Sequence, residues 1–200
     1  MKGKFLLLGL GLLSTALLIA LGVSWLHAGV SGGSPASLNP VGTGGSAPMS
    51  NTQTAHEAYT TLSQWLSGWA QDGIVVALSC TFQKEDKSPV GWTFQVYSPT
   101  SQQLANVLIE GSDIWVLREL AALYPQQPLA LDTWGMDSSA ALDTWWAGRG
   151  QLLWSQPQAQ TLALHLGTRP EGGLTWQVTL LSAEGKVIDF QEIPADATAP

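Results

Sequence analysis

The chain has 200 residues, 45% of them hydrophobic, with ten tryptophans and one cysteine. This apolar content suffices for a buried core and excludes an intrinsically disordered protein, while a single cysteine excludes an internal disulfide. The formal net charge of −7 repels phosphate backbones and argues against nucleic acid as a partner.

The first 28 residues have the pattern of a membrane anchor. Lys2 and Lys4 precede 22 mostly apolar residues, Phe5 to Leu26, and a helix of that length, about 33 Å, crosses a bilayer core of about 30 Å. No Lys or Arg follows before Lys84, so the positive-inside rule predicts a cytoplasmic N-terminus and an extracytoplasmic remainder. We predict an uncleaved single-pass signal anchor over residues 1–28. Cleavage of this segment as a signal peptide, after Ser31, is the alternative.

Residues 29–54 carry no charge and consist mainly of Gly, Ser, Pro and Thr. Such a segment buries too little apolar area to offset its ordering entropy. We predict a flexible linker with an r.m.s. reach of about 28 Å.

Two later stretches share a helical pattern at an offset of 80 residues. His56–Gly68 and Met136–Gly148 both contain Leu-x-x-Trp and end at glycine. The apolar spacing predicts two amphipathic helices, with Asp137 or Ser138 capping the second and Gly148 ending it.

Each predicted helix is followed by strands in which apolar and polar residues alternate. The inward set of the first strand in each half is Val76, Leu78, Cys80 and Phe82, and then Leu162, Leu164 and Leu166. The middle strands carry the related phrases GWTFQV (91–96) and GLTWQV (173–178), and third strands follow at Leu104–Glu110 and Lys186–Glu192. Ile114–Glu119 is predicted as a further strand, with a helix as the alternative.

The sequence therefore predicts an α+β fold made of two helix-plus-antiparallel-meander modules. The first spans residues 55–120, a connector spans 121–134, and the second module spans 135–196. A module of under about 70 residues has a marginal core, so we expect the two to share an interface.

This order of elements, with a G-[WL]-T-[FW]-Q-V phrase on each middle strand, resembles tandem PepSY-like modules of membrane-anchored bacterial proteins. The resemblance covers roughly residues 56–195. It implies binding to, or restraint of, a secreted protease or another cell-envelope partner.

Residues with catalytic or metal-binding chemistry are few. His56, Cys80 and His165 lie too far apart in the pattern to form a metal site, and Cys80 is predicted to be buried and inert. We therefore predict a protein without cofactor, metal site or enzymatic activity. The alternative is a hydrolase that uses loop carboxylates, drawn from Glu110, Asp113, Asp137, Asp143 and Asp189.

Nine of the ten tryptophans lie beyond the predicted anchor, and these divide into two groups. We expect the core to contain Trp65, Trp92, Trp134, Trp145 and Trp176. Four others do not fit an inward period and are candidates for an exposed aromatic patch that binds a glycan, peptide or protein: Trp69, Trp115, Trp146 and Trp154. The predicted function is that of a membrane-tethered binding or regulatory module with a protein or peptide partner.

Overall fold

The structure, a computed structural model, describes residues 53–85 and 91–196. The predicted anchor and all but the last two residues of the predicted linker lie outside these ranges. Within them, no helix is both long and apolar enough to cross a bilayer.

The described residues form a mixed α+β fold, as predicted. The first half contains α2 (Ala55–Trp69), β1 (Ile74–Gln83), β2 (Trp92–Ser98), β3 (Gln103–Glu110) and β4 (Asp113–Ala121). After the 3-10 turn η1 (Leu131–Thr133), the second half contains α3 (Ser138–Trp145), the π-helical turn η2 (Trp146–Gly150), α4 (Gln151–Trp154), β5 (Ala159–Thr168), β6 (Leu174–Ser182) and β7 (Val187–Pro194).

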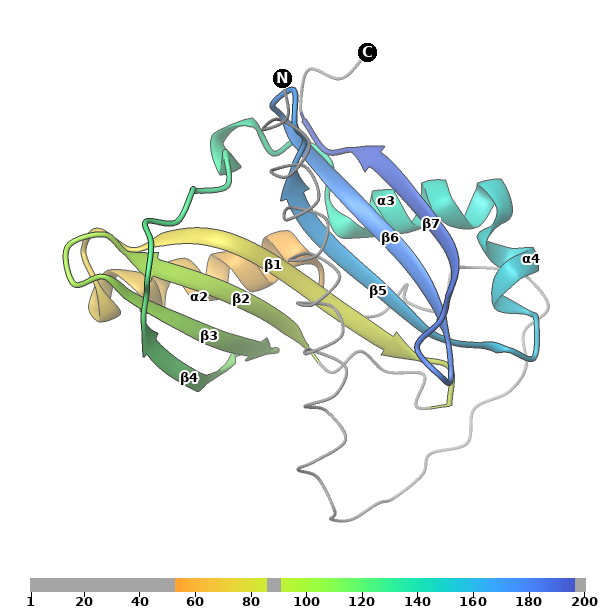
Figure 1. The fold of residues 1–200 in the computed structure, drawn as a ribbon, viewed down its shortest axis with the longest axis horizontal. Coiled ribbons are helices and arrows are strands. Elements are labelled where there is room, and N and C mark those ends of the chain that lie inside the picture. Colours follow the sequence, from red (N-terminus) through yellow and green to blue (C-terminus); the bar gives the residue numbers. More distant parts are fainter. Residues whose placement is uncertain (1–52, 86–90, 197–200) are drawn as a thin grey trace, which may run out of the picture. The chain divides into compact units, whose positions relative to one another are not determined.

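All seven strands belong to one antiparallel sheet, in the order β4-β3-β2-β1-β5-β6-β7. The first strand of each half lies at the centre, where β1 pairs with β5 from Leu78 opposite Leu166 to Gln83 opposite Thr161. Figure 1 shows the two groups of strands fanning out from this central pair. The stretches 55–120 and 135–196 therefore join through main-chain hydrogen bonds within one compact unit.

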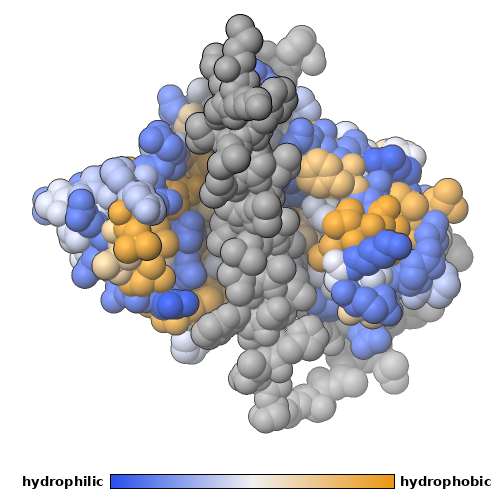
Figure 2. Space-filling model, viewed as in Figure 1, coloured by the Kyte–Doolittle hydropathy of each residue, from blue (hydrophilic) through white to orange (hydrophobic). Residues whose placement is uncertain are grey.

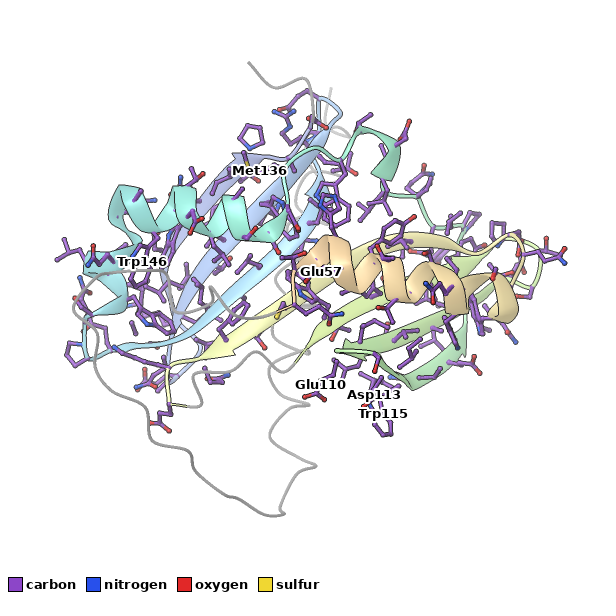
Figure 3. The ribbon with its side chains drawn as sticks, turned by 180° about the vertical axis from the view of Figure 1, so that it is seen from behind. Glu57, Glu110, Asp113, Trp115, Met136 and Trp146 are labelled. Carbon is purple, nitrogen blue, oxygen red and sulfur yellow. The ribbon has the colours of Figure 1, made fainter. Side chains whose placement is uncertain are left out.

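Both long helices cover the same face of the sheet, which Figure 3 shows from the helix side. Helix α2 is capped by Thr54, whose hydroxyl accepts from the Glu57 N–H while the Glu57 carboxylate accepts from the Thr54 N–H, a capping box. Helix α3 is capped by Asp137, one of the two residues predicted to cap it, whose carboxylate accepts from the Ser138 N–H. Leu62 of α2 and Trp145 of α3 are fully buried and form the helix side of the core.

An aromatic cluster lies where the two halves meet under the helices. Trp176 packs against Trp92 and Trp134, with ring centroids 5.9 and 6.0 Å apart. The indole N–H groups of Trp134 and Trp176 both donate to the Met136 carbonyl, at 2.7 and 2.8 Å. The indole donors of Trp134 and Trp176 are thus satisfied while their rings fill the core.

The structure corrects three local predictions. A β-bulge between Val75 and Ala77 shifts the phase of β1, so Val75 is buried and Val76 is not, although Leu78, Cys80 and Phe82 point inward as predicted. Gly148 does not end the second helix, because the chain continues through η2 into α4. Trp65 is only partly buried, and it stacks on Trp69 at 5.7 Å.

Candidate interaction surface

The cavity described by residues 53–85 and 91–196 is small and lacks the acids that a carboxylate mechanism needs. A small cavity lies where α2 and α3 begin, and its lining contains no acidic side chain: Gln53, Thr54, Phe82, Trp92, Ser138, Ser139 and Leu142. In residues 53–85 and 91–196, no group of three or more His, Cys, Asp or Glu side chains is placed to hold a metal ion.

The five carboxylates of the hydrolase alternative are dispersed over the fold. Glu110 and Asp113 flank the β3–β4 turn, Asp137 caps α3, and Asp143 is exposed on α3. Asp189 is nearly buried, where it accepts from the Trp145 indole at 2.9 Å and pairs with Arg149 at 2.8 Å. Only Glu110 and Asp113 are neighbours, and both are exposed.

Among the described residues, the other side chains with reactive or metal-binding chemistry are Cys80, His56 and His165, and they lie in three separate places in the fold. Cys80 is buried, and this burial raises the pKa of its thiol. His56 lies against the Trp134 ring with centroids 3.8 Å apart, and its Nδ1 is 3.4 Å from Asp137. His165 lies on β5, on the opposite face of the sheet from Leu164 and Leu166.

The structure does not bring the four candidate tryptophans into one patch. Trp69 is partly buried at the end of α2, and its indole donates to Glu119 at 2.7 Å. Trp146 and Trp154 are partly buried in the second half, where Lys84 lies 5.7 Å from the Trp154 ring. Trp115 alone is well exposed, at 55%, and Figure 3 shows it far from Trp146.

Trp115 is instead part of an apolar edge on β4. Its neighbours Val116 and Leu117 are 46% and 58% exposed, and Leu123 and Tyr124 just after the strand are exposed as well. We call Trp115, Val116 and Leu117 the β4 edge patch. Figure 2 shows apolar surface among hydrophilic residues on the β3–β4 side of the molecule.

The direction of the β4 main-chain groups follows from the strand register. The Ala122 N–H donates to the Gln102 carbonyl at 2.8 Å, so alternate pairs of this ladder are hydrogen-bonded. On β3 the even-numbered residues therefore bond to β4, and Val107 and Ile109 bond to β2. Val116 and Ile114, which lie opposite these two residues, direct their N–H and C=O groups away from the sheet.

The charges around the patch are mainly negative. Asp113 shares the face of Trp115, since the two are two residues apart on β4, and Glu110 pairs directly with Asp113. Figure 3 shows Glu110 and Asp113 beside Trp115. Glu119 lies further along the strand, and Arg118 is the only cationic side chain on β4.

The opposite edge of the sheet is obstructed. By the same alternation, counted from the hydrogen bond of the Ala195 N–H to the Leu174 carbonyl, Phe190 directs its main-chain groups outward. The Arg149 guanidinium donates a hydrogen bond to the Phe190 carbonyl at 3.2 Å, so this acceptor already has a partner. Pro194, at another outward position, has no N–H to offer.

The chain enters the described fold beside the β4 edge patch. The Gln53 side-chain amide donates to the Gly111 carbonyl at 2.8 Å and accepts from the Gly111 N–H at 3.1 Å. The Trp92 indole donates to the Gln53 carbonyl at 2.9 Å. Gly111 belongs to the turn that starts β4, so the root of the predicted linker is attached to that turn.

A second surface, the sheet face away from the helices, carries Thr93, Gln95, Thr175 and Gln177. Thr175 is buried and the other three are partly buried. The Gln95 amide donates to Asn106 at 3.4 Å and the Gln177 amide to Glu192 at 3.2 Å. The hydrogen bonds of Gln95, Gln177 and Thr175 therefore go to residues of the adjacent strands, since the Thr175 hydroxyl donates to the Ile193 carbonyl at 3.2 Å.

Of the exposed large hydrophobic residues in and just after β4, only Trp115 was predicted from the sequence as part of a binding surface; Val116, Leu117, Leu123 and Tyr124 were not. The available signal was the run Ile-Trp-Val-Leu, which lacks the polar alternation of the other strands. Comparison of this chain with protein-family models, with curated proteins and with solved structures finds no match.

Proposed function

We propose that the chain is a membrane-tethered, extracytoplasmic binding or regulatory module that acts without catalysis on a protein or peptide of the cell envelope, such as a secreted protease. The observation that carries this proposal is the β4 edge patch, an exposed apolar surface on a strand whose outer main-chain groups face away from the sheet. Exposed apolar patches on soluble domains commonly mark interaction sites.

Among the described residues, the paired acids Glu110 and Asp113 are exposed at a turn and do not line the cavity, which argues for binding and against the hydrolase alternative. The small cavity is lined by no carboxylate, and Asp189 is already paired with Arg149. A carboxylate mechanism needs two acids on either side of one substrate bond.

The proposal includes a tandem origin of the two halves from a PepSY-like module. The phrases GWTFQV and GLTWQV fall on β2 and β6, and each of these lies between the first and third strands of its half. Phe94 and Trp176, at matching positions of the two phrases, are both fully buried. The membrane anchor and the N-in orientation rest on the sequence pattern of residues 1–28.

The test is site-specific photo-cross-linking in intact cells that produce the full-length protein. A photoreactive amino acid at position 115 is expected to trap an envelope protein in the membrane fraction. The same residue at position 190, an exposed aromatic site on the obstructed edge, is the matched control and should trap none. The function is wrong if position 115 yields no product, or if the protein is recovered in the cytoplasm.

A further inference from the structure

We propose that the outer edge of β4 binds an extended segment of the partner protein as an added antiparallel strand, and that this segment carries a Lys or Arg two residues after an apolar residue. This inference rests on the proposed function and deepens it, because it names the mode of binding and the chemistry of the partner.

The main chain of β4 supplies the template. Ile114 and Val116 direct their N–H and C=O groups outward, as derived from the ladder with β3. An added antiparallel strand would form two hydrogen bonds with each of these residues. Such strand addition is an established way in which exposed sheet edges bind extended peptides.

The side chains of β4 select the apolar residue. Because alternate residues of a strand face opposite sides of the sheet, the partner residue opposite Trp115 lies on the same face as the indole ring. Trp115 is 55% exposed, so an apolar partner residue would remove indole surface from water. Aromatic and β-branched residues form favourable cross-strand pairs of this kind.

The charges select the basic residue. Asp113 precedes Trp115 by two residues and shares its face, with Glu110 directly opposite on β3. In an antiparallel pairing, the partner residue that faces Asp113 comes two residues after the one that faces Trp115. A Lys or Arg at that position would face two carboxylates, whereas an acidic residue would be repelled.

A second copy of this chain fits the edge less well than a flexible segment. The ladder with β3 shifts at the bulge around Leu117, where Val116 and Arg118 lie opposite consecutive β3 residues. Two rigid copies would match only over Ile114–Val116, because each would meet the bulge of the other. A flexible segment can bend at Leu117 and continue beside Glu119 and Ala121.

The test uses the full-length protein in detergent micelles and a fluorescent octapeptide, Thr-Val-Ser-Val-Thr-Lys-Thr-Val, in a polarisation titration. Its second valine is placed to face Trp115 and its lysine to face Asp113. Methylating the amide nitrogens of the serine and the middle threonine, which would bond to Val116 and Ile114, should weaken binding at least about tenfold. Methylating the second valine and the lysine instead should change affinity less than about twofold, because those amides point away.

Matched protein variants locate the site. Trp115→Ser is expected to lower affinity about tenfold, while Phe190→Ser, the same change at the exposed aromatic residue of β7, should leave it unchanged. Asp113→Asn should weaken the lysine peptide severalfold and leave a norleucine version unaffected. Circular dichroism of each variant checks that the fold is retained.

The outcomes separate this inference from the proposed function. Strand addition is wrong if the octapeptide does not bind, or if both methylated peptides lose affinity equally. If position 115 nevertheless cross-links an envelope protein, the function stands and only the mode of binding fails. If sedimentation shows a dimer that Trp115→Ser abolishes and the peptide cannot dissociate, a second copy occupies the edge and the inference is overturned.

Discussion

Cys80 illustrates how strand phase controls the chemistry of one side chain. Alternation predicted that Cys80 points inward from β1, and the structure confirms this, with 3% of the residue exposed. Burial disfavours the thiolate and raises the pKa of the thiol, so the nucleophilic form is scarce at neutral pH.

The native protein should therefore react with a soluble thiol reagent far more slowly than the same protein unfolded in urea. Cys80→Ala should lower the free energy of unfolding by about 1 to 2 kcal/mol through lost packing. Labelling kinetics and urea denaturation measure the two effects. Rapid labelling of the native state would show that this position opens to solvent.

The Asp72 carboxylate links the turn before β1 to the turn between β2 and β3 by hydrogen bonds. Its carboxylate accepts from the Ser98 hydroxyl at 2.8 Å and from the Thr100 N–H at 2.6 Å. Hydrogen bonds from Thr100 and Ser98 lower the pKa of Asp72 from 3.8 to about 2. Because the pKa is lower in the folded state, the carboxylate stabilises the fold above the unfolded-state value, and this contribution is lost as the pH falls towards about 2.

Asp72→Asn should accordingly be less stable than the parent protein at neutral pH. The difference should shrink as the pH falls from about 4 to about 2, since the parent loses the charge that the variant lacks. Urea midpoints at several pH values measure it, with Asp143→Asn, an exposed helical site, as the control. A difference that is constant with pH would contradict the assignment.

At the scale of elements, the end of the second helix could not be predicted from the local sequence. A glycine after an apolar stripe often ends a helix, and Gly148 fits that rule. The helical path nevertheless continues past Gly148, which has open space around it, to Gly150, which lies directly against the Trp145 ring where an added Cβ would overlap it. This tertiary contact leaves no local signal in the sequence.

The two glycines form a matched pair for mutation. Gly150→Ala should destabilise the protein by about 1 to 3 kcal/mol, because the methyl group overpacks against Trp145. Gly148→Ala should be neutral or stabilise by up to about 1 kcal/mol, because alanine has the higher helix propensity. Denaturant unfolding distinguishes them. Equal effects would mean that the π-helical turn adapts freely.

For β4, the local sequence predicted the strand but could not predict its position in the sheet. Its pattern predicted a strand over Ile114–Glu119, and the structure confirms it with Asp113–Ala121. That β4 lies at an edge depends on the order of strands across the whole sheet, which no local pattern contains. Of the three residues of the β4 edge patch, therefore, only Trp115 could be predicted from the sequence.

At the scale of the whole molecule, the pairing of β1 with β5 joins the two halves into one sheet. Periodicity predicted helices and meanders in the correct order, but the joining of both halves into one sheet depends on pairs such as Leu78 with Leu166. These partners lie far apart in the sequence, and many alternative pairings satisfy the same alternation. One continuous core predicts cooperative unfolding.

Phe94→Ala and Trp176→Ala, one in each half, should each cost about 3 to 5 kcal/mol, whereas Gln95→Ala and Gln177→Ala should cost less than about 1 kcal/mol. Each core variant should still unfold in a single transition that is shifted as a whole. Calorimetry of the full-length protein in detergent tests this. Two resolved transitions, each sensitive to only one of the core mutations, would mean that the halves unfold independently.

The attachment of Gln53 to the β3–β4 turn has a mechanical consequence. Any pull transmitted along the N-terminal segment reaches the fold at Gln53, and its first load falls on the two hydrogen bonds with Gly111 and on the indole of Trp92. Because Gly111 lies in the turn that leads into β4, that force is delivered beside the strand whose outer edge is the proposed docking site. Tension between the proposed anchor and a docked partner would thus act first on the contacts of Gln53 with Gly111 and Trp92, ahead of the central β1–β5 pair.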